Sequence, residues 1–281
     1  MTRPASLLCR PWRHALATLC FASGLAVIWP GAHAAAPLVS PSPATAEVPA
    51  GQAWWQGFRD PVLSQLIGPA PADAQRAAAT AQAWIAAQVF HVQAATTHEI
   101  GRTARTEQRL MMNEPPEAPQ RAARLSQLAG RIDAADTATQ DRLARRNEQL
   151  DRLATLAAMS PEALTALVQP RLQALSLPQF DAEVPPADSA QDDGVAAEIR
   201  RLIDHERRAT LALAAAKELQ LEYQTLKATN PQEPEAQMEV LQSYERLLLQ
   251  GQQLAAASGD LALAWLNLLQ AHGGRLSALG R

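Results

Sequence analysis

Cysteine, aromatic residues and an excess of charge of either sign are what this sequence has least of. Its 281 residues include two cysteines, Cys9 and Cys20, and 4% aromatic residues. So few cysteines exclude a small fold held together by disulfide bonds. The 25 Lys and Arg nearly balance the 28 Asp and Glu, which gives a formal net charge of −3. Proteins that bind nucleic acid by neutralising its phosphates usually have an excess of basic residues. This chain has none, so we expect no nucleic-acid partner.

Branched apolar residues and long apolar runs are also scarce beyond residue 34. Only nine valines and six isoleucines occur there, too few to furnish a large sheet. The same part of the chain has no run of the ~18 apolar residues that a membrane-spanning helix needs. Alanine, leucine, glutamine, glutamate and arginine are abundant instead, and these residues are strong helix formers. The composition therefore predicts an all-α fold.

Residues 1–34 have the layout of a secretory signal peptide. Three arginines come first, an apolar run occupies residues 15–29, and Ala32-His33-Ala34 forms a cleavage site with small residues at its first and third positions. Removal of this segment would remove both cysteines, which suits an oxidising compartment such as a bacterial periplasm. We therefore predict an exported protein that lies in the periplasm or is associated with the outer membrane.

Proline-rich stretches divide the rest of the chain into two helical halves. Each half has a long helical pattern, a turn with Asn, Pro and Glu, and a second long helical pattern; the turns lie near 113–119 and 230–234. We predict two antiparallel long-helix hairpins in an elongated molecule. The predicted segments are the signal peptide 1–34, a disordered Pro/Ala leader 35–52, the first helical half 53–175, a Pro-rich connector 176–194, the second helical half 195–274 and a tail 275–281.

The two halves repeat each other at an offset near 116 residues. Asn113 and Asn230 mark corresponding turns. A repeat of this length predicts that both hairpins are built in the same way. The matching positions are Leu125 with Leu241, Leu128 with Tyr244, Ile132 with Leu248, Ala135 with Gly251, Leu150 with Leu266 and Leu153 with Leu269.

The last long helical pattern contains the clearest heptad spacing, which is typical of coiled-coil packing. We predict that one line of residues, seven apart, is a helix-packing seam within the chain. A second line beside it has small residues that would let another helix approach closely, and we predict that it contacts a second copy. The seam is Val240, Leu247, Leu254, Leu261 and Leu268, and the second line is Tyr244, Gly251, Ser258 and Trp265.

Four stretches, taken together and in this order, carry a resemblance to a known family. Residues 54–63 read WWQGFRDPVL, and residues 153–164 read LATLAAMSPEAL. Residues 175–185 form a proline-containing stretch between the two helical halves, and residues 264–274 read AWLNLLQAHGG. They resemble the TolC-like outer-membrane efflux proteins, also called outer-membrane factors. The amino-terminal motif of that resemblance comprises Trp54, Trp55, Phe58, Asp60 and Pro61.

The resemblance implies a helical component of a tripartite efflux or type I secretion system. It implies self-association, as a trimer if the chain is family-like, or packing with a full-length outer-membrane channel, and a periplasmic adaptor is a further candidate partner. The helical patterns of residues 73–112 and 194–230 contain no alternating stretch of ~9–11 residues, so we expect a shortened member without barrel strands. Two alternatives stay open: a non-transporting accessory protein derived from the family, and a free-standing periplasmic scaffold or chaperone.

The polar residues predict no catalytic, cofactor or metal site. His91 and His98 lie seven apart, whereas metal ligands on one helix are usually three or four apart. No nucleophile and base occur in a local pattern that indicates an enzyme. We interpret the basic group at residues 142–146 as a solvated helix face. The aromatic residues at positions 54–58 are expected to cap the apolar end of the helical assembly.

Overall fold

The computed structural model describes residues 54–68, 73–113, 120–178, 193–229 and 231–271. All regular secondary structure in these residues is helical, as the composition predicts. The predicted signal peptide, leader and tail, and most of the connector, lie outside the described residues. The helices are η2 (Trp54–Phe58, 3-10), α2 (Pro61–Ile67), α3 (Ala74–Met112), α4 (Arg121–Ala157), α5 (Pro161–Gln173), α6 (Asp193–Ala228) and α7 (Pro234–Ala271).

Short polar side chains fix where several helices begin. Asp60, Asp73 and Ser160 each accept hydrogen bonds from backbone N–H groups of the first turn of α2, α3 and α5. Such capping satisfies donors that have no partner within the helix. Pro61 and Pro161 occupy the first helical turn, where a missing N–H costs nothing. The sequence signals for these three starts therefore act locally.

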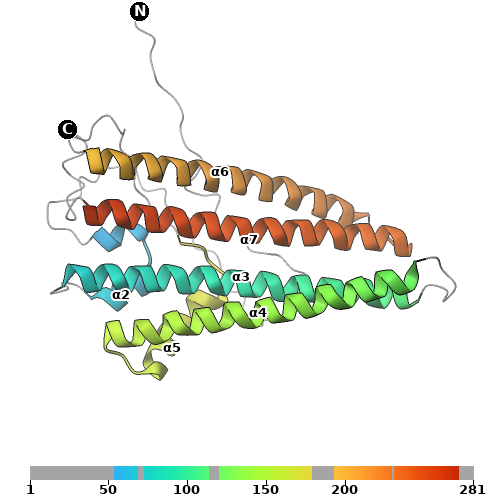
Figure 1. The fold of residues 1–281 in the computed structure, drawn as a ribbon, viewed down its shortest axis with the longest axis horizontal. Coiled ribbons are helices and arrows are strands. Elements are labelled where there is room, and N and C mark those ends of the chain that lie inside the picture. The colour runs from blue at the N-terminus through green and yellow to red at the C-terminus, as the bar shows by residue number, and fades with distance from the viewer. Residues whose placement is uncertain (1–53, 69–72, 114–119, 179–192, 230, 272–281) are drawn as a thin grey trace, which may run out of the picture.

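The four long helices form two antiparallel hairpins that lie side by side in one layer (Figure 1). Helix α3 pairs with α4, α6 pairs with α7, and α3 packs against α7, so the order across the layer is α6, α7, α3, α4. Each helix has 36–39 residues and is about 55 Å long at 1.5 Å per residue. The elongated double hairpin predicted from the sequence is therefore what the structure shows.

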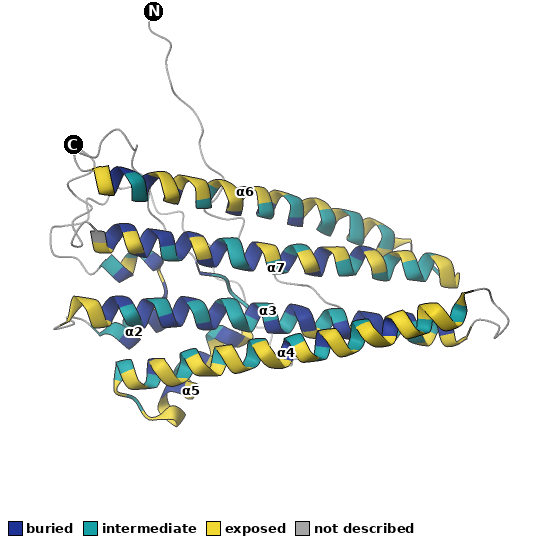
Figure 2. Ribbon diagram, viewed as in Figure 1, coloured by how far each residue is buried: buried dark blue, intermediate teal, exposed yellow. Residues whose placement is uncertain are grey.

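How far the residues of a long helix are buried depends on whether that helix is central or outer in the layer (Figure 2). The central helices α3 and α7 have many buried residues and fewer exposed ones, whereas about half of the residues of the outer helices α4 and α6 are exposed. Small residues allow the helices to pack closely. A Cβ built on Gly259 would lie 2.6 Å from Cγ2 of Val89, and one built on Gly101 would lie 3.3 Å from Cβ of Ala135. Glycine at these two positions sets the spacing of α3 from α7 and from α4.

The apolar core is concentrated at one end, which we call the base. There α3 begins, α4 ends, and the short elements η2, α2 and α5 pack against the long helices (Figure 1). The largest side chains in this cluster include Trp84, Leu153, Ile199, Leu202 and Leu266, which are at most 1% exposed. We call the opposite end, where each hairpin turns, the tip. The base therefore holds both hairpins in one core.

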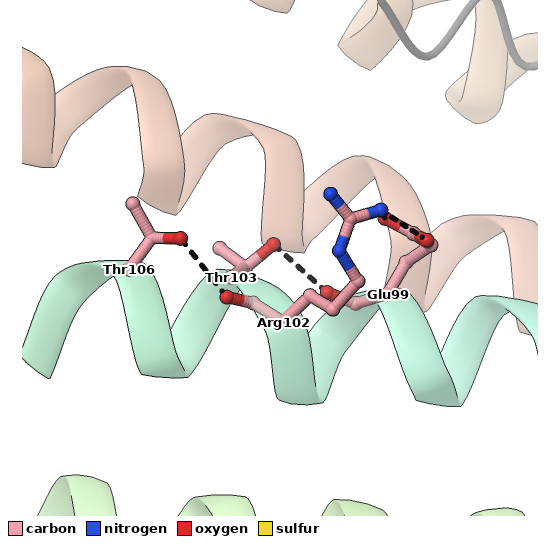
Figure 3. A network of polar contacts seen from close by, with 4 residues as sticks. All are labelled: Glu99, Arg102, Thr103 and Thr106. Atoms are coloured by element: carbon pink, nitrogen blue, oxygen red, sulfur yellow. Dashed lines mark hydrogen bonds and ion pairs between the residues drawn. The ribbon is translucent and has the colours of Figure 1, made fainter. Parts of the chain in front are cut away.

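Between the base core and a small apolar cluster near the tip, which contains Met111 and Leu128, the interior is more polar. Buried threonines of α3 satisfy their hydroxyls on their own helix; Thr103, for example, donates to the carbonyl oxygen of Glu99 at 3.0 Å. Figure 3 shows the same pattern for Thr106 and Arg102, beside an ion pair between Arg102 and Glu99 at 2.9 Å. The helix therefore continues through a stretch with few large apolar residues.

Candidate functional site

Asp60 is the centre of the amino-terminal motif. It is 5% exposed, and its Oδ1 accepts the backbone N–H groups of Val62 and Leu63 at 2.9 and 3.1 Å. Its Oδ2 accepts Nε1–H of Trp84 at 2.9 Å and Nε2–H of Gln88 at 3.1 Å. One carboxylate therefore caps α2 and fixes that helix to α3.

The rest of the motif packs around this carboxylate. Trp55 and Phe58 are buried in the base core, and Trp54 meets each of them edge to face, with ring centroids 5.6 and 6.4 Å apart. Arg171 of α5 lies 3.8 Å from Oδ2 of Asp60. The aromatic residues cap the apolar end of the helical layer, as the sequence predicts.

The predicted seam of α7 packs within the chain. Leu247, Leu254, Leu261 and Leu268 are at most 5% exposed, and Val240 near the tip is half-buried. Leu254 contacts apolar residues of α6, whereas Leu261 and Leu268 belong to the base core. The seam therefore joins α7 to both of its neighbours along the layer.

The second line on α7 lies inside the chain and does not face outward. Gly251, Ser258 and Trp265 are buried, because α7 is a central helix of the layer with neighbours on both sides. Tyr244 is half-buried and packs on Tyr223 of α6, with ring centroids 4.9 Å apart. This line is therefore not available to a second copy, which is a correction of the prediction.

Arginines of α4 contact both α3 and α7 and so link the two hairpins between the base core and the tip. Arg131 donates to Glu107 of α3 at 3.0 Å and also forms an ion pair with Glu245 of α7. One level nearer the base, Arg142 donates to Thr97 of α3 and, at 3.3 Å, to Gln252 of α7. The Nε2 of Gln252 closes this second link by donating to Thr97 Oγ1 at 2.9 Å.

These links correct the interpretation of residues 142–146 as a solvated face. Arg142 is half-buried in the link just described, and Arg146 approaches Nδ1 of His91 at 3.2 Å. Arg145 is exposed, as expected. The Arg131 and Arg142 links went unpredicted from the sequence. Local spacing could not have found them, because a turn centred on residue 116 would place Glu107 opposite residue 125 and not opposite Arg131.

The links place two titratable groups in unusual surroundings. Burial raises the pKa of the Glu107 carboxyl; the charge of Arg131 opposes this rise, and the charge of Glu245 adds to it. Oε1 of Glu107 is buried without a hydrogen-bond partner. Burial lowers the pKa of His91, and the charge of Arg146 lowers it further. Neither group is part of a nucleophile or metal arrangement in the described structure.

The outer side of α4 exposes a continuous line of residues spaced three and four apart, which we call the α4 stripe. It is mostly small near the tip and acidic toward the base. The outer side of α6 exposes a similar line, which we call the α6 stripe, with basic residues toward the base and large apolar ones nearer the tip. The α4 stripe is Gly130, Ala134, Thr137, Asp141, Ala144 and Glu148; the α6 stripe is Arg200, Asp204, Arg207, Leu211, Ala214, Glu218, Leu221 and Thr225.

Within the described residues, no group of three or more His, Cys, Asp or Glu side chains could hold a metal ion. None of the described helices is long and apolar enough to cross a membrane. Comparison of the chain with protein-family models, with curated proteins and with solved structures finds no match. The two outer stripes, the links between hairpins and the base motif are thus the features from which a function is argued.

Proposed function

We propose that the chain is an exported helical component of a tripartite efflux or type I secretion system, similar to the TolC-like proteins. In this proposal it lies in the periplasm or at the outer membrane, and it acts by packing side by side with further copies or with a full-length channel. A periplasmic adaptor is a further candidate partner. Its role is structural, without catalysis and without a cofactor.

The observation that carries this proposal is the single layer of long helices with two different exposed edges. A layer whose outer helices each have one uncovered long side supports extension by further helices of the same length and direction. Exposed apolar side chains on one edge, Leu211 at 61% and Leu221 at 66%, favour a partner there. A wall of parallel rods is also the arrangement that the TolC-like resemblance implies.

A second candidate is an accessory protein that keeps the same helical layer without transport. The same exposed edges favour it, because they could equally receive helices of another envelope protein. The two candidates differ in one consequence: only the first requires that export of toxic compounds or of a secreted protein depend on this chain.

The test compares a strain that lacks the chain with the same strain carrying the gene on a plasmid. We expect the untagged chain to pellet with the outer membrane, to crosslink into multiples of its own mass, and to restore resistance to exported compounds. If the chain forms a multimer in the envelope but the two strains are equally resistant, the accessory role is supported and the transport role is rejected. A soluble periplasmic monomer with unchanged resistance would reject both.

A further inference from the structure

We propose that His91 is a proton-sensitive latch: it holds α5 against the hairpin of α3 and α4 while its imidazole is neutral, and it releases α5 when the imidazole takes up a proton. His91 lies near the middle of α3 and is half-buried. This inference goes beyond the proposed function, because the latch acts whether or not the chain takes part in export.

Two other helices contact the ring of His91. Its Nδ1 lies 3.2 Å from Nη1 of Arg146 in α4, and the ring has a hydrogen bond with the backbone of Leu172 in α5. The guanidinium of Arg146 is held in place, because its Nε and Nη2 both donate to Oδ1 of Asn147, at 3.1 and 2.7 Å. Leu172 is 5% exposed and belongs to the base core. One imidazole therefore joins α3, α4 and α5.

The chemistry of arginine determines which form of the ring fits at this place. A guanidinium keeps its charge at any ordinary pH and offers only N–H donors, so Nδ1 of His91 must be the acceptor. Nε2 then has the ring hydrogen and donates to the carbonyl oxygen of Leu172, which can only accept. A proton on Nδ1 would place a hydrogen and a positive charge against Arg146. Burial and the charge of Arg146 accordingly lower the pKa of His91, although the bond to Leu172 raises it.

The two central helices bring no charged side chain to this level. Residues 87–95 of α3 include no Asp, Glu, Lys or Arg. On α7, residues 252–259 are level with His91, since the first of them contacts Thr97 and the last lies against Val89. These eight residues are also uncharged. The charge that a proton on the ring would meet therefore comes from α4 and the short elements of the base.

The charged groups that the neighbouring elements bring to this region are Arg142, Arg145, Arg146 and Glu148 on α4, Arg171 on α5 and Asp60 before α2. Arg142 is occupied in its link to α7, and Arg145 and Glu148 are exposed. Arg171 lies 3.8 Å from Asp60, whose oxygens also accept four N–H groups. Of these charges it is that of Arg146 that acts on the ring.

Helix α5 is the element that can move away. It has only 13 residues and contains Pro170, which donates no backbone hydrogen bond, whereas α3 and α4 pair along their length (Figure 1). Its buried side chains are Leu164, Val168 and Leu172, each at most 5% exposed. Protonation favours the conformer in which the ring reaches water, so the population shifts toward a released α5 that exposes these side chains.

Hydrogen–deuterium exchange of the wild-type chain at pH 7.5 and pH 5.5 tests the latch, with rates corrected for the intrinsic effect of pH on exchange. We expect the protection of backbone amides in α5 to fall at least severalfold at pH 5.5, while protection in the middle of α7 stays constant. His91→Gln is the decisive variant, because its amide can accept from Arg146 and donate to Leu172 but does not titrate. Its α5 protection should be the same at both pH values. His98→Gln changes an exposed histidine of the same helix and should keep the wild-type response.

An NMR titration of the His91 ring in the wild type gives a second readout that depends on no variant. We expect its midpoint at lower pH than in the urea-unfolded chain. The latch would be overturned by a midpoint at or above the unfolded one, by α5 protection that does not change with pH, by an equal change in His91→Gln, or by a loss of protection that spreads to the middle of α7. None of these results bears on whether the chain takes part in export.

Discussion

At the scale of single residues, Asp60 has more structural consequences than any other side chain of the amino-terminal motif. Its two oxygens receive four N–H groups from α2 and α3 and lie near Arg171. Buried donors that lose an acceptor keep their desolvation penalty without a compensating bond. The cap on α2 is made with residues next in the chain, but the bonds of Asp60 to Trp84 and Gln88 depend on how α3 packs, so they could not be predicted from local spacing.

We expect Asp60→Ala to lower the free energy of unfolding by about 3 kcal/mol, because it removes a cap and leaves two buried side-chain donors unpaired. Asp73→Ala is the matched control, since Asp73 caps α3 at an exposed position and contacts only that helix. Its expected loss is about 1 kcal/mol. Urea unfolding followed by circular dichroism measures both, and equal losses would contradict the role assigned to Asp60.

Glu107 should give the chain an unusual pH response at the residue scale. Burial raises its pKa in the folded protein above the ordinary value of a glutamate, so the folded protein binds this proton more tightly than the unfolded chain does. Ionised Glu107 therefore costs stability, and that cost disappears as the pH falls through the raised pKa toward the ordinary value.

Thermal unfolding of wild type and Glu107→Gln at pH 7 and pH 5 tests this. We expect the wild type to gain melting temperature relative to the variant as the pH falls, with His91 cancelling because both proteins contain it. Glu239→Gln, at an exposed position of α7, is the control and should show no such gain. If the melting temperature of the wild type falls relative to that of Glu107→Gln between pH 7 and pH 5, the raised pKa of Glu107 is refuted.

At the scale of helices, close approach of α3 and α7 depends on one missing side chain. A methyl group at Gly259 would stand 2.6 Å from Cγ2 of Val89, so the helices must move apart to admit it. We expect Gly259→Ala to lower the free energy of unfolding by about 2 kcal/mol, as overpacking does. Gly130→Ala, which fills open space, should cause no loss because alanine favours the helix. Denaturant titration of the two variants distinguishes these outcomes.

The links from α4 are the second determinant at this scale. Arg131→Met should lower the free energy of unfolding by about 2 kcal/mol, because it leaves Glu107, whose side chain is 4% exposed, without its charged partner. Arg105→Met removes an ion pair with Asp136 in which both side chains are more than one-third exposed, and it should cost under about 1 kcal/mol. Denaturant unfolding measures both variants. If they lose the same free energy of unfolding, the Arg131 link does not stabilise the joined hairpins.

The helices themselves were predictable from the sequence, whereas the partners of their faces were not. Proline and asparagine mark the turns, and the heptad line through Leu247 and Leu261 predicts a seam that the structure buries. The line through Gly251 and Ser258 has the same spacing, and only the position of α7 between two neighbours shows that it too is internal. Periodicity reports that a helix face is packed, but it does not report against which helix.

At the scale of the whole molecule, the order α6, α7, α3, α4 decides what remains free for partners. The central helices have neighbours on both sides, although α7 also exposes residues such as Leu249, and the exposed lines of α4 and α6 run along the two outer edges, on which the layer can grow. These lines were predictable as helix faces, yet only the order of the packed helices shows that they lie on the two outer edges of the layer. The proposed role as an assembling component of an export system depends on this growth.

Native mass spectrometry of the wild-type chain beside Leu221→Glu tests this central claim most directly. The substitution places a charge at a position that is 66% exposed in the single chain, so the fold should survive in both proteins. We expect the wild type at a fixed multiple of the subunit mass and the variant at the mass of one subunit, with equal helical content by circular dichroism. A wild type at the mass of one subunit, or a variant assembled like the wild type, would contradict the account.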